Sequence, residues 1–341
     1  MEERKRDSGL DVVRALAILM VLLIHVSSIW LQQTPGTADW WTALVWGAAA
    51  RPAVPMFFMC SGALMLCRDL TPKRILTHNL PRILCAMFAW AFLYRLVSMG
   101  SFTPEGLWDA VKRTLLFQHE GHLYYLHILL LVYASLPIVR VFLRTASRRE
   151  LEYALAVWSA TGILFPLLCC FWPFTLVPPL STLWGLPMGF SAVGVALLGH
   201  YLRQYGGSIR RGWYAGALAA GLALTFGGTA VLSLADGRLS EVFLGGITPG
   251  PMLMAFGWFG LILGRKTARP ALWTKATGRL ARASFCVYLS HILFLQRLTY
   301  LGLSPGNAAL FIPLIFLVIL AGGWLTWEVL HRIPFVRSYF V

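Results

Sequence analysis

The chain alternates between long apolar stretches and short segments that carry most of its charges. Ten apolar stretches are long enough for a helix to cross a membrane, which takes about 20 residues. They are residues 12–30, 52–67, 81–99, 122–142, 151–171, 183–202, 212–234, 247–264, 283–301 and 307–329. No segment between them is long enough for a soluble domain. The pattern predicts an all-α, polytopic membrane protein with about ten transmembrane helices, and one membrane domain over residues 1–341.

The distribution of basic residues predicts the orientation of these helices. If the N-terminus is cytoplasmic, ten crossings return the C-terminus to the cytoplasm. Of the 29 Lys and Arg residues, 22 then lie in inner segments, four lie in outer segments and three lie within spans. Cytoplasmic loops of membrane proteins carry such an excess of Lys and Arg. We therefore expect both termini on the cytoplasmic side of a bacterial inner membrane.

Composition supports a membrane protein and argues against a nucleic-acid-binding protein and a metal-binding protein. The chain has 341 residues, of which 58% are hydrophobic and 13% are charged, and its mean hydropathy is +0.68. The net charge of +15 would suit nucleic acid, but the basic residues occupy short loops between apolar runs, so no nucleic-acid partner is expected. The six cysteines lie inside apolar runs without zinc-ligand spacing. No paired metal-ligand histidines occur, and no metal is expected.

Four tryptophans outside the predicted spans fit a position at the membrane surface. Trp40, Trp41 and Trp46 lie in the outer segment 31–51, and Trp108 lies in the outer segment 100–121. Tryptophan is enriched at both membrane–water interfaces. We expect all four to serve as interface anchors.

The first span carries ionisable residues at a helical spacing. Arg14 and His25 are eleven residues apart, which places them on one helical face, roughly 16 Å apart along the axis. Asp11 shares that face. Ionisable groups within a membrane usually face the protein interior and mark function. The alternative is that Arg14 reaches the headgroups and that His25 bonds a neighbouring helix.

The second span begins at a basic residue and ends with small residues. Arg51 stands at its outer end, before Pro52 and Pro55. Its guanidinium suits contact with either an anionic substrate or a lipid headgroup. The Ser61-Gly62 pair favours close packing of another helix. Near the other end of the chain, Glu328 is the one acidic residue in a late span, and we expect it to pair with an inner-side arginine.

Two further spans carry polar stripes. In the fourth span, His122 and Tyr125 share one helical face. They belong either to a functional site or to an aromatic belt at the membrane interface. Near the C-terminus, Ser284, Tyr288 and His291 follow the spacing of one helical face in an apolar helix. A histidine there is either a structural group or a functional one, since its pKa is near neutral in water.

Together these motifs resemble the acyltransferase-3 family of ten-helix bacterial inner-membrane acyltransferases. The resemblance is carried by the Arg14-x10-His25 spacing, the stretch from Val54 to Gly62, His122-Leu-Tyr-Tyr-Leu126 and Tyr288-Leu-Ser-His291. Two features depart from the family pattern. Arg74, His78 and Arg82 replace two arginines three apart, and Tyr124 replaces a tryptophan.

The resemblance implies transfer of an acetyl (acyl) group from acetyl-CoA to a hydroxyl of a cell-surface polysaccharide or its lipid-linked precursor. His25 would be the general base, and Arg14 would lie on the donor path. The inner basic residues implied as donor-binding are Arg74, Arg82, Arg279 and Arg282. The residues implied as substrate-binding are Arg51, His122, Tyr125, Tyr288 and His291. Acetyl-CoA is a co-substrate, so no resident cofactor is expected; the other partners are the glycan acceptor and membrane lipids.

The competing class is a transporter or flippase for a lipid-linked sugar, without chemistry. Histidine and arginine within spans also suit proton relays. Acidic residues, which proton-coupled carriers commonly use, are nearly absent from the spans. That scarcity favours the enzyme.

Overall fold

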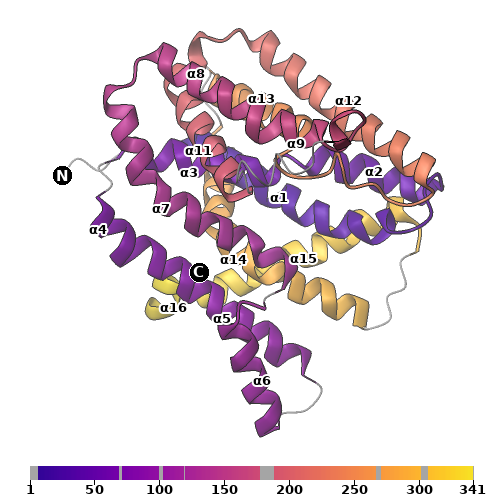
Figure 1. The fold of residues 1–341 in the computed structure, drawn as a ribbon. Coiled ribbons are helices and arrows are strands. Elements are labelled where there is room, and N and C mark those ends of the chain that lie inside the picture. Colours follow the sequence, from indigo (N-terminus) through magenta and orange to yellow (C-terminus); the bar gives the residue numbers. More distant parts are fainter. Residues whose placement is uncertain are drawn as a thin grey trace.

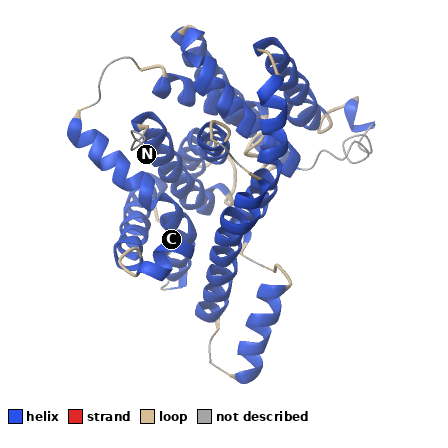
Figure 2. Cartoon of the chain, turned by 90° about the vertical axis from the view of Figure 1, so that its left-hand side faces the viewer, coloured by secondary structure: helices blue, strands red, loops and turns tan. Residues whose placement is uncertain are grey.

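A computed structural model shows a bundle of helices that surround α1 (Figure 1). It describes residues 7–68, 71–99, 103–118, 120–176, 188–265, 270–300 and 306–340, and this part of the chain contains no strand (Figure 2). The longer helices are α1 Ser8–Leu31, α2 Ala38–Ala50, α3 Ala53–Met65, α5 Leu80–Ser98, α6 Pro104–Leu115, α7 Tyr124–Thr145, α8 Arg148–Ser159, α11 Met188–Tyr205, α12 Arg211–Asp236, α13 Pro249–Leu263, α14 Ala271–Tyr300 and α15 Ala308–Leu330.

Short elements extend or connect these helices. They are α4 Pro72–Arg74, α9 Phe165–Leu168, α16 Pro334–Tyr339, the π-helical turns Ile75–Asn79 and Ala160–Leu164, and the 3-10 turns Gly121–Leu123, Phe174–Leu176 and Gly206–Ser208.

Seven of the ten predicted spans are confirmed by the length and composition of the described helices. They are Ser8–Leu31, Ala38–Met65, Pro72–Ser98, Gly121–Thr145, Arg148–Leu168, Arg211–Asp236 and Ala308–Leu330. The predicted span 247–264 corresponds to α13, a shorter apolar helix. Span 183–202 lies partly outside the described residues. Span 283–301 lies largely in α14, which is not among the helices apolar enough to count as a candidate span. The count of ten stays a prediction.

The second predicted span needs a correction. Residues 38–50 form helix α2, and a kink at Arg51-Pro52, where the backbone stays helical, joins it to α3. One kinked helical span, Ala38–Met65, therefore replaces much of the expected outer loop. Trp40 is 0% exposed, and the prediction that it anchors the membrane surface is wrong. α2 packs against α1, α12 and α15, and Trp40 lies on the buried side of its first turn.

α1 lies at the centre because apolar residues cover most of its circumference. It packs against α2, α3, α14 and α15, and Val13, Ile18, Leu22 and Val26 are fully buried. Its first turn is capped by Asp7, whose carboxylate accepts hydrogen bonds from the backbone N–H groups of residues 9 and 10. Such a cap stabilises a helix by about 1 kcal/mol.

Two glycines let α3 and α11 approach closely. A Cβ on Gly62 would lie 1.7 Å from the carbonyl oxygen of Ala196, and one on Gly199 would lie 2.1 Å from that of Met59. The packing role expected for Gly62 is therefore confirmed. Arg203 extends this contact, because it donates to the carbonyl of Ala63 at 2.7 Å. These contacts hold α3 against α11.

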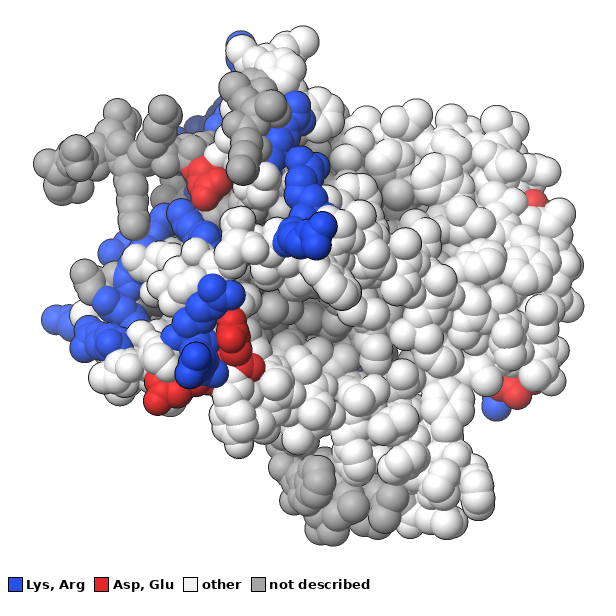
Figure 3. All heavy atoms as spheres, turned by 90° about the horizontal axis from the view of Figure 1, so that it is seen from above, with Lys and Arg blue, Asp and Glu red and all other residues white. Residues whose placement is uncertain are grey.

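The charged residues gather at one end of the bundle. In Figure 3 the Lys and Arg side chains cluster toward the left, the side on which Figure 1 places the N-terminus, and much of the remaining visible surface is uncharged. α1 begins at this end, and we call it the basic end. The pairing expected for Glu328 is confirmed, since Arg279 donates to its carboxylate at 2.7 Å. Which side of the membrane the basic end faces stays a prediction.

Candidate active site

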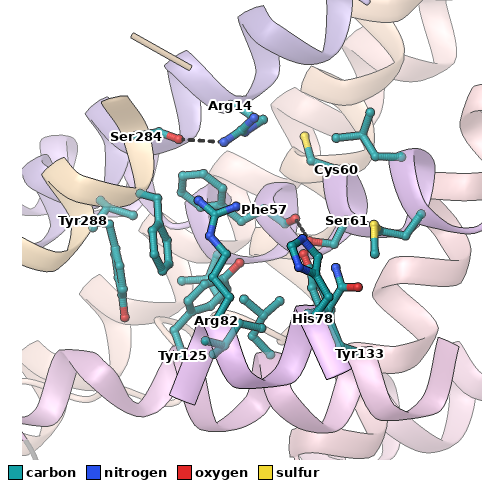
Figure 4. Close-up of a pocket in the computed structure, with 18 of the residues that line it drawn as sticks. Arg14, Phe57, Cys60, Ser61, His78, Arg82, Tyr125, Tyr133, Ser284 and Tyr288 are labelled. Carbon is teal, nitrogen blue, oxygen red and sulfur yellow. Dashed lines mark hydrogen bonds between the residues drawn. The ribbon is translucent and has the colours of Figure 1, made fainter. Parts of the chain in front are cut away.

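A cavity of about 270 Å³ runs into the bundle beside α1. One part of its lining consists of Arg14, Arg68, His78 and Arg82, which we call the donor end. Figure 4 shows Arg14, His78 and Arg82 among the side chains that line the cavity. Residues of α3 from Val54 to Met65 line one side, and the helical rise between them corresponds to about 16 Å. The cavity is therefore long and narrow, with its positive charge at one end.

Four different segments position the donor end. Arg14 comes from α1, Arg68 follows α3, His78 lies in the π-helical turn before α5, and Arg82 lies in the first turn of α5. Arg14 donates to the hydroxyl of Ser284 on α14 at 3.2 Å. That bond fixes the guanidinium between the two helices while its other N–H groups stay available to a ligand.

Toward its other end the cavity lining includes four side chains from four helices, which we call the tyrosine level. They are Val21 on α1, Val54 on α3, Tyr125 on α7 and Tyr288 on α14. The rings of Tyr125 and Tyr288 lie 5.4 Å apart between centroids. Both side chains are nearly buried, at 8% and 6% exposure.

About one helical turn beyond the tyrosine level, each of the four segments carries a histidine or an arginine. His25 follows Val21 by four residues, Arg51 precedes Val54 by three, His122 precedes Tyr125 by three, and His291 follows Tyr288 by three. We call this set the histidine level. α1 and α14 run away from the donor end and α3 and α7 run toward it, so the two pairs reach the same depth from opposite directions.

The three imidazoles of the histidine level lie close together. Ring centroids are 4.9 Å apart for His25 and His291, 5.4 Å for His122 and His291, and 6.4 Å for His25 and His122. Among the described residues, no group of three or more His, Cys, Asp or Glu side chains has the geometry to hold a metal ion. The cluster brings together residues that are up to 266 positions apart in the chain.

Two of these histidines have a nitrogen without a partner. His122 Nε2 and His291 Nε2 are buried and make no hydrogen bond within the described part of the chain. His291 Nδ1 lies 2.7 Å from the carbonyl oxygen of Tyr288. A carbonyl only accepts, so Nδ1 carries the hydrogen, and Nε2 of a neutral ring carries the free lone pair. An unpaired buried acceptor beside two other imidazoles fits a site that handles protons.

The histidine level opens away from the donor end. His25 and Arg51 are partly exposed, Tyr124 is 43% exposed, and His291 is 0% exposed. Arg51 interacts electrostatically with His25, Tyr124 and Glu241. His25 is thus the imidazole that a molecule entering from this side reaches.

The structure brings some of the sequence-predicted donor residues to the cavity and not others. Arg14 and Arg82 line it. Arg74 is exposed on α4 and is not part of the lining. Arg279 bonds Glu328 and lies over the ring of Trp324. Arg282 lines a separate cavity of about 160 Å³ together with Asp11.

The predicted substrate residues also separate into two groups. Arg51, His122 and His291 belong to the histidine level, whereas Tyr125 and Tyr288 line the donor cavity. Tyr288 is bound through its hydroxyl to the carbonyl of His122. Sequence reasoning did not single out Arg68 or Glu241. Arg68 directly follows an apolar span, which is a usable signal, but nothing near Glu241 in the sequence indicates its position beside Arg51.

Comparison with protein families gives the class. The chain matches the family model described as "Acyltransferase domain" of the acyltransferase-3 type over residues 7–328, nearly its whole length. The chain therefore belongs to this family of membrane acyltransferases. Comparisons with curated proteins and with solved structures gave no match.

Proposed function

We propose that this protein transfers an acetyl group from acetyl-CoA to a hydroxyl group of a cell-surface polysaccharide or of its lipid-linked precursor. One observation carries the proposal: a long cavity with three arginines at one end stops one helical turn short of three clustered histidines. This arrangement suits a long anionic donor on one side and a hydroxyl acceptor on the other.

The donor end suits the phosphates of acetyl-CoA. Arg14, Arg68 and Arg82 come from separate segments and converge on one opening, and guanidinium groups form strong charge-assisted hydrogen bonds with phosphate. The pantetheine arm would then follow α3 toward the tyrosine level. Asn79 lines the cavity next to His78, and its buried Oδ1 lacks a hydrogen-bond partner within the described segments. The amide N–H groups of the arm are suitable donors for it.

The chemistry would occur where the tyrosine and histidine levels meet. His25 would take the proton of the acceptor hydroxyl as its oxygen attacks the thioester carbonyl. The new C–O bond forms, the C–S bond breaks, and the CoA thiolate leaves with the electron pair and receives the proton. His291 Nε2, with its free lone pair, would accept a hydrogen bond from His25 and orient that ring.

The acceptor would approach from the side to which the histidine level opens. Arg51 and Tyr124 border that opening. Both residues can bind the hydroxyl and carboxylate groups that a sugar offers. Within the family, the Ala50-Arg-Pro-Ala-Val-Pro55 stretch resembles the stand-alone O-acetyltransferase of enterobacterial common antigen. A lipid-linked glycan of that general kind, on the outer face of a bacterial inner membrane, is our proposed acceptor.

The test is an acetyl-transfer assay with purified protein in liposomes. Acetyl-CoA labelled in the acetyl group is supplied on one side, and release of CoA is followed with and without bacterial glycolipid. We expect CoA release to depend on the glycolipid and the label to move to it. If no acetyl-CoA is consumed and glycolipid instead crosses the bilayer in a protein-dependent manner, the transporter class replaces the enzyme.

A further inference from the structure

The tyrosine level forms a barrier between the donor cavity and the histidines. The cavity lining includes Tyr125 and Tyr288 but not His25, His122 or His291. The ring of Tyr288 lies 5.9 Å from that of His122 and 6.0 Å from that of His291, between centroids. An acyl thioester held in the cavity must therefore place its carbonyl beside these two rings to reach the histidines.

Neither ring can turn aside without losing contacts. Phe58, which is fully buried, lies 4.8 Å from the Tyr125 ring between centroids, and Phe57 lies 6.1 Å from it. Tyr288 is held by its hydroxyl bond to the carbonyl of His122. Packed interiors resist added volume, because even one methylene forces side chains off their preferred positions.

We propose that Tyr125 and Tyr288 limit the length of the acyl group, so that the enzyme transfers acetyl and rejects longer straight chains. This inference rests on the proposed function. The carbonyl carbon must stand next to His25, and the carbon chain attached to it extends from the same point. A methyl group fits beside the rings, whereas each further methylene meets the wall that Phe57, Phe58 and the two tyrosines form. In a hydrophobic pocket one methylene changes specificity by about 10- to 200-fold.

Tyr125 is the better residue for the test. Tyr288 bonds the backbone at His122, so truncating it would also disturb a histidine of the site. Tyr133 gives a matched control, because it lines the same cavity from the same helix, about 12 Å nearer the donor end by helical rise. Tyr125→Ala and Tyr133→Ala remove the same side-chain volume from opposite ends of one cavity.

The experiment compares initial rates of CoA release from acetyl-, propionyl- and butyryl-CoA, with bacterial glycolipid as acceptor. For the wild type we expect acetyl-CoA to be faster than butyryl-CoA by at least about tenfold. Tyr125→Ala should raise the butyryl-to-acetyl ratio by about tenfold or more. Tyr125→Phe, which keeps the ring, and Tyr133→Ala should keep the wild-type ratio. If Tyr125→Ala does not fold, Tyr125→Leu gives a smaller enlargement with the same expected direction.

Three results would overturn the inference: equal use of butyryl- and acetyl-CoA by the wild type, an unchanged ratio in a folded Tyr125 variant, or the same increase in Tyr133→Ala. Failure of the proposed function looks different, because the wild type would then release CoA from none of the three donors.

Discussion

Replacing His25 and Arg14 separately tests whether donor binding and chemistry occupy different ends of α1. His25 lies outside the cavity lining and Arg14 lies within it. We expect His25→Ala to lower the rate of acetyl transfer by about 10²- to 10⁴-fold, the usual contribution of a general base, which corresponds to about 2.7–5.5 kcal/mol in the activation barrier. Its affinity for acetyl-CoA should stay unchanged.

Arg14→Ala should show the opposite pattern. It removes hydrogen bonds from a charged group, worth about 1.5–3 kcal/mol, and we expect acetyl-CoA to bind about 10- to 150-fold more weakly. His25→Gln serves as the matched control for the first variant. An amide keeps a hydrogen bond but cannot take the proton, so it should fail as His25→Ala does.

The assay combines equilibrium binding of labelled acetyl-CoA with single-turnover transfer in liposomes, after size-exclusion chromatography has shown that each variant is folded. Wild-type transfer by His25→Ala would refute the role of the base and move attention to His291. Loss of donor binding in His25→Ala would refute the separation of the two ends.

Three further predictions concern topology, donor binding and packing. Reporter fusions at the C-terminus and near Arg238 should report opposite sides of the membrane; the same side would exclude ten crossings with both termini cytoplasmic. Arg82 lines the cavity, so Arg82→Ala should weaken acetyl-CoA binding in a salt-sensitive manner. Arg279 bonds Glu328 away from the cavity lining, so Arg279→Ala should bind acetyl-CoA normally. Equal losses of affinity in the two variants would indicate that total charge alone matters. Gly62→Ala should lower the free energy of unfolding by about 1–3 kcal/mol or more, and with it the melting temperature, because its Cβ would lie 1.7 Å from a carbonyl oxygen of α11. Gly216→Ala, with open space around it, should be neutral, and an equal melting temperature for both would contradict the packing argument.

The sequence predicted which polar side chains lie near one another better than which of them line the cavity. Helical periodicity placed Arg14 with His25, and Ser284 with Tyr288 and His291, because 3.6 residues per turn fixes which side chains share a face. It did not show that Tyr125 and Tyr288 would line the donor cavity. That depends on how four helices are placed next to one another, which the period of one helix does not contain.

Charge counting had a similar limit. It indicated which loops are basic, but Arg82 and Arg279 look alike in such a count. Only the tertiary structure shows one of them at the cavity and the other bonded to Glu328. The error at Trp40 has the same origin, since tryptophan suits both a membrane surface and a protein interior, and contacts with neighbouring helices decided between them.

The placement of both ends of the site on α1 has a consequence for how an acyl group moves through the membrane. One continuous helix separates Arg14 from His25, so the distance between them, about 16 Å by helical rise, is that of a rigid rod. The two side chains therefore keep this separation while the helix stays intact. In the proposed reaction the donor molecule itself therefore provides the displacement. Its nucleotide stays at the near surface while the length of its flexible arm delivers the reactive carbon to the far half of the bilayer.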